Sequence, residues 1–337
     1  MKVVIDRKSC APEPVYNYVK NAFETAQRLA GGASDVWQPW ADAKPFPQEA
    51  AFPRPTEVYQ NLAAWLAGRD TPRMLRRTIR IIGRMTLLTL VDRDIDSPYW
   101  KAGEADQQDL ASSLLLSRYP ECLLCSALPL TYSNPCFIIV CNANHIEKAH
   151  HDEPNTNNVD TIQNLPVLDG RLVLKIRDGT ADSRVMAATS AKTEPMEQDP
   201  EGNWIDDWDP KKPEVIVINP QYLRSLQEKG FPRYNDDLIN HARLDTARKA
   251  AERAAGVEIQ ASIDLLNTLE ITLLHEISHL GTMNWAEDVD DDCYTWDNAV
   301  RLQTCTNAEN VALFVVATDL TKNHNLKVTK SGMIEPI

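Results

Sequence analysis

Hydrophobic residues recur at helical spacing through both outer thirds of the chain. In residues 14–30 they fall three and four apart until Gly31 and Gly32 interrupt the pattern. This predicts a helix over 14–30, followed by an ordered loop rich in Pro and Trp over 32–55. The same spacing predicts further helices over residues 56–68, 71–92, 235–256, 262–280, 295–303 and 307–320.

The middle of the chain has a different pattern. Short apolar or alternating runs bounded by Pro, Gly and Asn predict strands over 135–141, 170–179 and 213–220, and the polar segment 191–213 predicts a surface excursion. Helices flanking a block of strands indicate an α+β fold. We expect one compact domain over 1–337, since no clear linker interrupts the chain. It would comprise a mainly helical part (1–130), strands and loops (131–220) and a second helical part (221–337).

Charge and hydropathy narrow the possible partners. The chain has 35 basic and 48 acidic residues, a net charge of −13, so we expect no nucleic-acid partner. The arginines in 71–92 alternate with apolar residues and indicate the solvent face of an amphipathic helix. No apolar run reaches the ~18 residues of a membrane span, so we expect no membrane partner. The N-terminus lacks the apolar centre of a signal peptide, which fits either an intracellular protein or one whose leader has been removed.

Cysteines and scattered histidines offer weaker metal-binding patterns. Seven cysteines leave at least one thiol unpaired within the chain, and Cys293–Cys305 is the most local candidate disulfide. A zinc knuckle is disfavoured because two of the four central cysteines lie inside an apolar strand pattern: Cys122, Cys125, Cys136 and Cys141. The cluster His145, His150, His151 and Asp152 reads as a solvated polar loop.

The strongest chemical signal is the sequence His275-Glu276-Ile277-Ser278-His279. On a helix, residues four apart share a face, so both imidazoles can bind one Zn²⁺ ion. Glu276 is then placed to take a proton from a zinc-activated water. A leucine-rich helix of this kind is expected to be buried, and a metal would compensate for burying its polar groups.

A catalytic zinc site needs a third protein ligand. Glu309, in the helix predicted over 307–320, is one candidate. The acidic run that follows a turn at Gly281 offers others: Glu287, Asp288, Asp290, Asp291 and Asp292. For Asp288 and Asp290 we favour a solvated loop.

These motifs resemble those of the aspzincins, the deuterolysin-like and peptidyl-Lys fungal zinc metalloendopeptidases. That family pairs H-E-x-x-H with G-T-x-D-x-x-Y-G. Here Asp291-x-x-Tyr294 keeps the Asp and Tyr, Thr295 replaces the final Gly, and Asp288-Val289 replaces Gly-Thr. The downstream segment 307–314, "NAENVALF", resembles the family pattern N-A-D-x-Y-A-L-Y/F, and "EVIVINP" resembles its strand before the active helix.

The resemblance implies specific roles and a fold. Asp291, or Asp292 one residue later, would be the third zinc ligand, and Tyr294 would donate a hydrogen bond to the oxyanion. The fold would be zincin-like: a small mixed sheet packed on the active-site helix, with additional N-terminal helices. Secretion with a removed leader is implied, with a cytoplasmic location as the alternative.

The sequence thus predicts zinc-dependent hydrolysis of a peptide or protein substrate, with Glu276 as general base. Two alternatives remain open. One is a zinc hydrolase dedicated to a single peptide or amide in a biosynthetic pathway. The other is a binding protein that keeps the fold without activity. The sequence does not indicate the oligomeric state.

Overall fold

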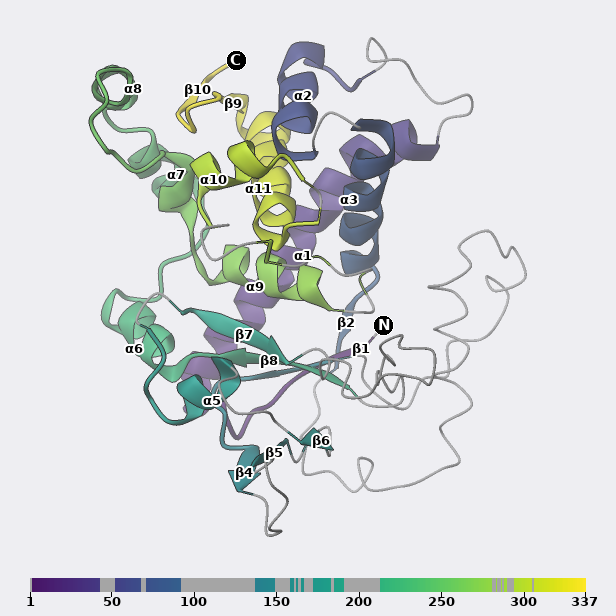
Figure 1. Ribbon diagram of the computed structural model, residues 1–337, viewed down its shortest axis with the longest axis vertical. Coiled ribbons are helices and arrows are strands. Elements are labelled where there is room, and N and C mark those ends of the chain that lie inside the picture. The colour runs from purple at the N-terminus through teal and green to yellow at the C-terminus, as the bar shows by residue number, and fades with distance from the viewer. Residues whose placement is uncertain are drawn as a thin grey trace, which may run out of the picture. The chain divides into compact units, whose positions relative to one another are not determined.

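Figure 1 shows the structure of the chain, a computed structural model. The structure describes residues 2–42, 52–67, 71–91, 137–148, 158–160, 162, 165–166, 172–182, 185–190, 213–280, 283, 286, 288–289, 294–304 and 306–337. The chain divides into two compact units: unit 1 contains residues 1–19 and 88–231, and unit 2 contains residues 20–87 and 232–337. Each unit is therefore built from two separate segments of sequence.

Unit 1 is organised around a five-stranded sheet with the order β2-β1-β3-β8-β7. Its strands are β1 (Lys2–Ile5), β2 (Thr89–Leu90), β3 (Phe137–Val140), β7 (Ala187–Ser190) and β8 (Glu214–Ile218). All neighbours are parallel except β7, which runs antiparallel to β8. Every residue of β3 and β8 is buried, as continuous apolar strands of a parallel sheet require. The predicted strands over 135–141 and 213–220 are confirmed, whereas β1 was missed.

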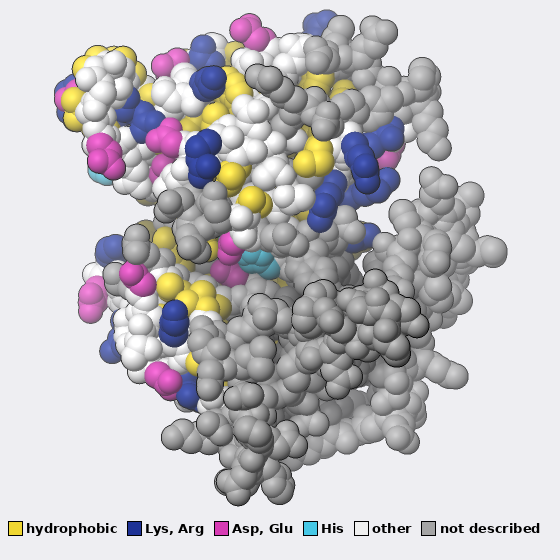
Figure 2. Space-filling view, in the orientation of Figure 1, with side chains coloured by type: hydrophobic (Ala, Val, Ile, Leu, Met, Phe, Trp, Pro, Cys, Tyr) yellow, Lys and Arg dark blue, Asp and Glu magenta, His cyan; other side chains and the backbone are white. Residues whose placement is uncertain are grey.

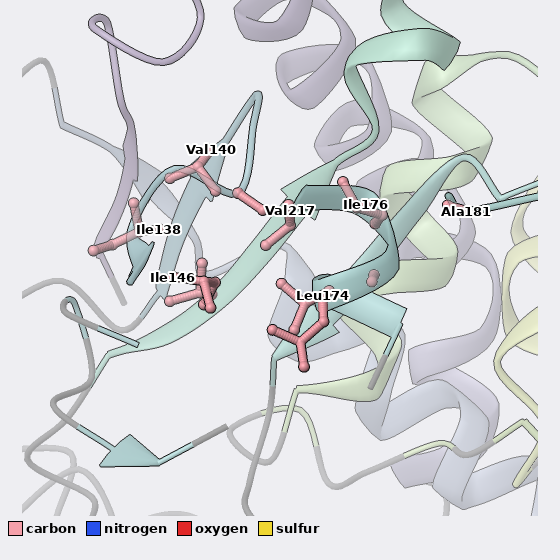
Figure 3. Close-up of a cluster of buried hydrophobic side chains, with 11 residues drawn as sticks. Ile138, Val140, Ile146, Leu174, Ile176, Ala181 and Val217 are labelled. Atoms are coloured by element: carbon pink, nitrogen blue, oxygen red, sulfur yellow. The ribbon is translucent and has the colours of Figure 1, made fainter. Parts of the chain in front are cut away.

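The core of unit 1 lies between this sheet and α5 (Leu172–Arg177) (Figure 3). Ile138, Val140 and Val217 from the sheet pack in one cluster with Leu174 and Ile176. The strand predicted over 170–179 is therefore wrong. A short apolar run is compatible with a helix as well as with a strand. Here the run forms a short helix whose buried side chains pack against one face of the sheet.

The loop after β1 is fastened to β3 at the carboxyl edge of the sheet. A disulfide joins Cys10 to Cys141, and the Ser9 hydroxyl accepts a hydrogen bond of 3.1 Å from the Cys141 N–H. The sequence did not indicate this pairing. Cys293 and Cys305, the pair favoured from the sequence, lie outside the described residues.

Smaller elements complete unit 1. Asn219 caps α6 (Pro220–Glu228) by accepting the Gln221 N–H at 2.9 Å. A separate three-stranded antiparallel sheet contains β4 (Ile146–Lys148), β5 (Asn158–Asp160) and β6 (Leu165–Pro166).

Unit 2 is mainly helical, and α1 (Glu13–Asp42) enters it from unit 1. Its other helices are α2 (Thr56–Leu62), a π-helical turn (Ala63–Ala67), α3 (Thr71–Met85), α7 (Asp236–Ala242), α8 (Thr246–Ala254), a 3₁₀ turn (Ile263–Leu266), α9 (Leu269–His279), α10 (Trp296–Leu302) and α11 (Ala308–His324). A hairpin of β9 (Leu326–Val328) and β10 (Ile334–Pro336) follows α11. Lys and Arg side chains gather over α3 (Figure 2), as expected for the solvent face of that helix.

Helix α1 runs through Gly31 and Gly32, so the helix end and loop predicted there are wrong. Beyond the glycines, Ala33, Trp37 and Trp40 continue the buried face of the helix. The Trp37 indole N–H donates to the Thr318 hydroxyl at 3.0 Å and thereby ties α1 to α11. This burial outweighs the cost of about 1 kcal/mol for each helical glycine.

Other predicted helices exist with different ends. The helix predicted over 71–92 ends at Met85, and Thr89–Leu90 form strand β2. The helix predicted over 235–256 is two helices, because Asp245 adopts a left-handed conformation with φ 57° between them. The helix predicted over 262–280 is likewise a 3₁₀ turn followed by α9.

At the coarse level the predicted α+β composition is confirmed, since helices accompany a small mixed sheet. The zincin-like arrangement, with the sheet packed on the active-site helix, stays a prediction. So does a single domain over 1–337. None of the helices in the described ranges is long and apolar enough to cross a membrane.

Candidate metal centre

Helix α9 presents the H-E-x-x-H motif from a buried position. All its residues except the last, His279, are buried, and the helix packs against α11 (Figure 1). The motif lies in the last two turns, where the helix dipole stabilises positive charge. Both features make this end of the helix suited to a positive charge.

The two imidazoles face each other together with the carboxylate of Asp288. Their Nε2 atoms lie 3.1 Å apart. One carboxylate oxygen of Asp288, Oδ1, lies 3.3 Å from Nε2 of His275 and 3.5 Å from Nε2 of His279. Among the described residues, this is the group of three potential ligand atoms close enough to hold one metal ion.

Asp288 reaches the histidines because the chain turns back after α9. Ala286 donates its N–H to the Ser278 carbonyl at 2.9 Å, and its own carbonyl lies 2.9 Å from Nδ1 of His279. Both contacts fasten Ala286, which is fully buried, to the end of the helix. Two residues later, Asp288 is therefore beside the motif.

This geometry changes the interpretation of the acidic run. We expected Asp288 to be a solvated loop residue; its side chain is indeed exposed, at 37%, but its carboxylate also contacts both imidazoles. Asp291 and Asp292, the ligands implied by the family resemblance, lie outside the described residues. The sequence does not indicate these contacts of Asp288, because they depend on the turn of the chain that the hydrogen bonds of Ala286 hold.

Glu309 contacts the opposite side of His275. Its Oε2 atom lies 3.1 Å from Nδ1, the ring nitrogen that faces away from the other two ligand atoms. Glu309 and Asp288 therefore contact different ring nitrogens of His275.

The positions of the protons follow from these partners. A carbonyl only accepts, so Nδ1 of His279 carries the proton that it donates to Ala286. Ionised Glu309 likewise only accepts, so Nδ1 of His275 carries a proton. In neutral imidazoles both Nε2 atoms then expose lone pairs toward each other and toward Asp288. Three acceptors at 3.1–3.5 Å require a positive charge between or on them.

The spacing of the three atoms fits zinc. Zinc–nitrogen and zinc–oxygen distances of about 2.0–2.1 Å place neighbouring corners of a tetrahedron about 3.3–3.4 Å apart. The separations of 3.1, 3.3 and 3.5 Å bracket that value. Two imidazoles and one carboxylate are also a common ligand set of catalytic zinc. The residues present therefore fit the ion.

A proton on His275 can supply the positive charge at this site in place of a metal ion. Burial acts to lower the pKa of His275, but hydrogen bonds to Asp288 and Glu309 raise it well above its usual value. Burial acts to raise the pKa of Asp288, but its hydrogen bond and charge interaction with His275 hold it well below the usual range. Without a metal, His275 and Asp288 thus form an ion pair.

Glu276 is also buried, and it follows His275 directly in α9. Its charge raises the pKa of His275, so the carboxylate lies within electrostatic range of the ligand atoms. Glu276 is the residue that the sequence predicts as the general base.

Tyr294 lies at the site as well. Its hydroxyl donates to the second carboxylate oxygen of Asp288 at 3.0 Å, and its ring stacks on His275 with 5.5 Å between centroids. The next residue, Thr295, has φ 86° and ψ 155°, a region populated almost entirely by glycine. Thr295 stands where the aspzincin pattern has glycine, and its backbone adopts a conformation typical of glycine.

Trp296 holds the segment behind Tyr294. Its backbone N–H donates to Asp264 at 2.8 Å, and its indole N–H donates to the Lys330 carbonyl at 2.9 Å. Burial raises the pKa of Asp264 to about 7, although the hydrogen bond from Trp296 acts to lower it. The sequence gives no indication of Asp264, because an isolated Asp in a short turn forms no recognisable pattern.

The polar cluster suggested around His145 is different. His145 is largely buried, with Nε2 3.7 Å from Oδ2 of buried Asp160, so it is not a solvated residue as expected. Burial lowers its pKa, partly offset by the charges of Asp160 and Asp6. His150, His151 and Asp152 lie outside the described residues.

Comparisons with known proteins identify no relative. The chain has no significant match to a protein-family model, to a curated protein or to a solved structure.

Proposed function

We propose that this chain is a zinc-dependent hydrolase that cleaves peptide bonds, with His275, His279 and Asp288 as metal ligands. The observation that carries the proposal is the convergence of three acceptor atoms at 3.1–3.5 Å beside a buried glutamate. The aspzincin-like motifs support the same chemistry. The Cys10–Cys141 disulfide fits the accompanying proposal of secretion, because such bonds persist in oxidising compartments.

Bound zinc would polarise the scissile carbonyl and acidify the attacking water. The carboxylate of Glu276 would accept the proton of that water and deliver it to the leaving nitrogen. The Tyr294 hydroxyl, which is held at Asp288 here, would donate a hydrogen bond to the oxygen on which negative charge develops. Its half-exposed position is compatible with reaching a substrate.

The test has two parts. Protein purified without chelators is expected to contain one zinc ion per chain by elemental analysis, and to hydrolyse casein or a panel of defined peptides. Cleavage of a single peptide but not casein would favour a dedicated hydrolase.

Glu276→Gln is expected to retain zinc and to lower kcat by roughly 10²–10⁴-fold, because the general base is lost. The exposed Glu258→Gln serves as the matched control and is expected to be fully active. Absence of zinc from the wild-type protein would refute the proposal and leave protonated His275 as the charge at the site.

A further inference from the structure

Glu309 is not one of the proposed zinc ligands, but its carboxylate contacts one of them, His275. We propose that Glu309 is a positioning residue, which holds His275 in the tautomer that directs the Nε2 lone pair toward the metal. This inference rests on the proposed function. It deepens that function by assigning a residue that binds neither metal nor substrate.

The contact is buried and directional. The side chains of His275 and Glu309 are 9% and 13% exposed, and Nδ1 and Oε2 lie 3.1 Å apart. A neutral imidazole carries one proton, and a carboxylate beside Nδ1 stabilises the tautomer with the proton on that nitrogen. Nε2 is then free to bind a cation, and the negative partner also makes the imidazole a better donor to the metal.

The fold fixes the first turn of α11 so that Glu309 meets His275. Asn310, which is 1% exposed, donates to the carbonyls of Leu66 and Ala299, both at 2.9 Å. Asn307 in turn donates to the Asn310 side-chain oxygen at 2.7 Å. In the segment "NAEN", Asn307 and Asn310 thus anchor the start of the helix, and Glu309 orients His275.

The second histidine provides an internal control. Nδ1 of His279 contacts the main-chain carbonyl of Ala286, which no side-chain substitution removes. A change at Glu309 is therefore expected to alter the tautomer of His275 and leave that of His279 unchanged. A general loss of folding would affect both.

The decisive measurement is ¹⁵N NMR of the histidine rings in metal-free, full-length protein at alkaline pH, above the raised pKa of His275, where both rings are neutral. In the wild type we expect both histidines to be protonated at Nδ1. In Glu309→Ala, His275 is expected to shift toward a mixture of tautomers. Glu309→Gln keeps the size and an acceptor oxygen, so it is expected to retain the Nδ1–H tautomer.

Zinc affinity, measured by competition with a chromogenic chelator, provides the second readout. Glu309→Ala is expected to weaken zinc binding by roughly 10–100-fold, with a smaller loss for Glu309→Gln. Glu57→Ala, an exposed glutamate in the first turn of α2, controls for removing a charge from a helix start and is expected to bind zinc normally.

The positioning role would be overturned if Glu309→Ala kept both the wild-type tautomer of His275 and the wild-type zinc affinity. It would also be overturned if both histidines changed equally in Glu309→Ala and in the isosteric Glu309→Gln. If the wild type bound no zinc, the proposed function would fail. The tautomer of His275 in the metal-free variants would then still decide whether Glu309 orients the ring.

Discussion

The two units each contain a cluster of polar side chains, and the clusters differ in how donors and acceptors are matched. In unit 1, the Asp6 carboxylate at the end of β1 accepts the N–H groups of Lys8 at 3.3 Å and Ser9 at 2.8 Å. The neighbouring disulfide fastens the same loop to β3. Here acceptors meet donors, and the cluster is explained by the local structure that it holds.

In unit 2 three acceptor atoms converge, and they are matched only when a metal ion or an extra proton on His275 lies among them. Nε2 of His275, Nε2 of His279 and Oδ1 of Asp288 converge, while the protons on both rings are directed to other partners. Such a cluster is costly to bury unless a cation is present. A binding site thus differs from a structural cluster less in the number of its polar residues than in whether the protein itself supplies a hydrogen-bond partner for each of them.

Removing the disulfide is the largest expected perturbation of unit 1. The bond closes a loop of 131 residues, for which chain entropy predicts a loss of about 5 kcal/mol in unfolding free energy. Cys10→Ala/Cys141→Ala should therefore unfold at much lower urea concentration than the oxidised wild type. Below its unfolding transition, we expect the variant still to bind zinc through unit 2. If the folded variant lost zinc binding, the two clusters would not be independent of each other.

The pH dependence of stability tests buried Asp264 in unit 2. Its pKa is raised from 3.8 to about 7, so between these values the native state keeps a proton that the unfolded state loses. The unfolding free energy should consequently fall as pH rises through this window, by up to about 4 kcal/mol. Asp264→Asn should remove that fall and be more stable than the wild type at pH 8. The unfolding free energy of each protein is measured by urea titration at several pH values. The same dependence on pH in both proteins would contradict this expectation.

Gly332→Ala should disturb the support of the Tyr294 segment. Gly332 has φ 75°, and a Cβ there would lie 2.5 Å from Cβ of Ala261 and 2.7 Å from Cδ1 of Trp296. We expect a loss of about 3 kcal/mol from overpacking and backbone strain together. Gly256 has φ 80° but open space around it, so Gly256→Ala isolates the backbone contribution and should cost about 1 kcal/mol. Thermal unfolding of both variants measures the difference, and equal losses would exclude the steric contribution.

Thr295→Gly should give the smallest change and act in the opposite direction. Thr295 at φ 86° and ψ 155° is strained, and glycine relieves the strain at some entropic cost. We expect a net gain of about 1 kcal/mol in unfolding free energy, with zinc affinity unchanged. Gln303→Gly is the control, because Gln303 at φ 49° and ψ 46° occupies the less strained left-handed helical region. A destabilised Thr295→Gly in denaturant titration would argue against strain beside the site.

The sequence by itself determined the local features of this protein. The spacing of His275 and His279 places them on one helical face, and the apolar residues around them predict the buried helix that the structure contains. The apolar runs around Phe137–Val140 and Glu214–Ile218 likewise predict strands. These features depend on neighbours a few residues apart, so the pattern of side chains is sufficient to identify them.

Only the tertiary structure decided which distant groups meet. Hydrogen bonds at Ala286 bring Asp288 to the histidines, and the anchored start of α11 brings Glu309 to His275. The pairing of Cys10 with Cys141, 131 residues apart, depends on β1 and β3 being neighbours in the sheet. Long-range packing also allows α1 to continue as a helix beyond Gly31 and Gly32. Contacts of this kind depend on the path of the whole chain, and no local periodicity encodes them.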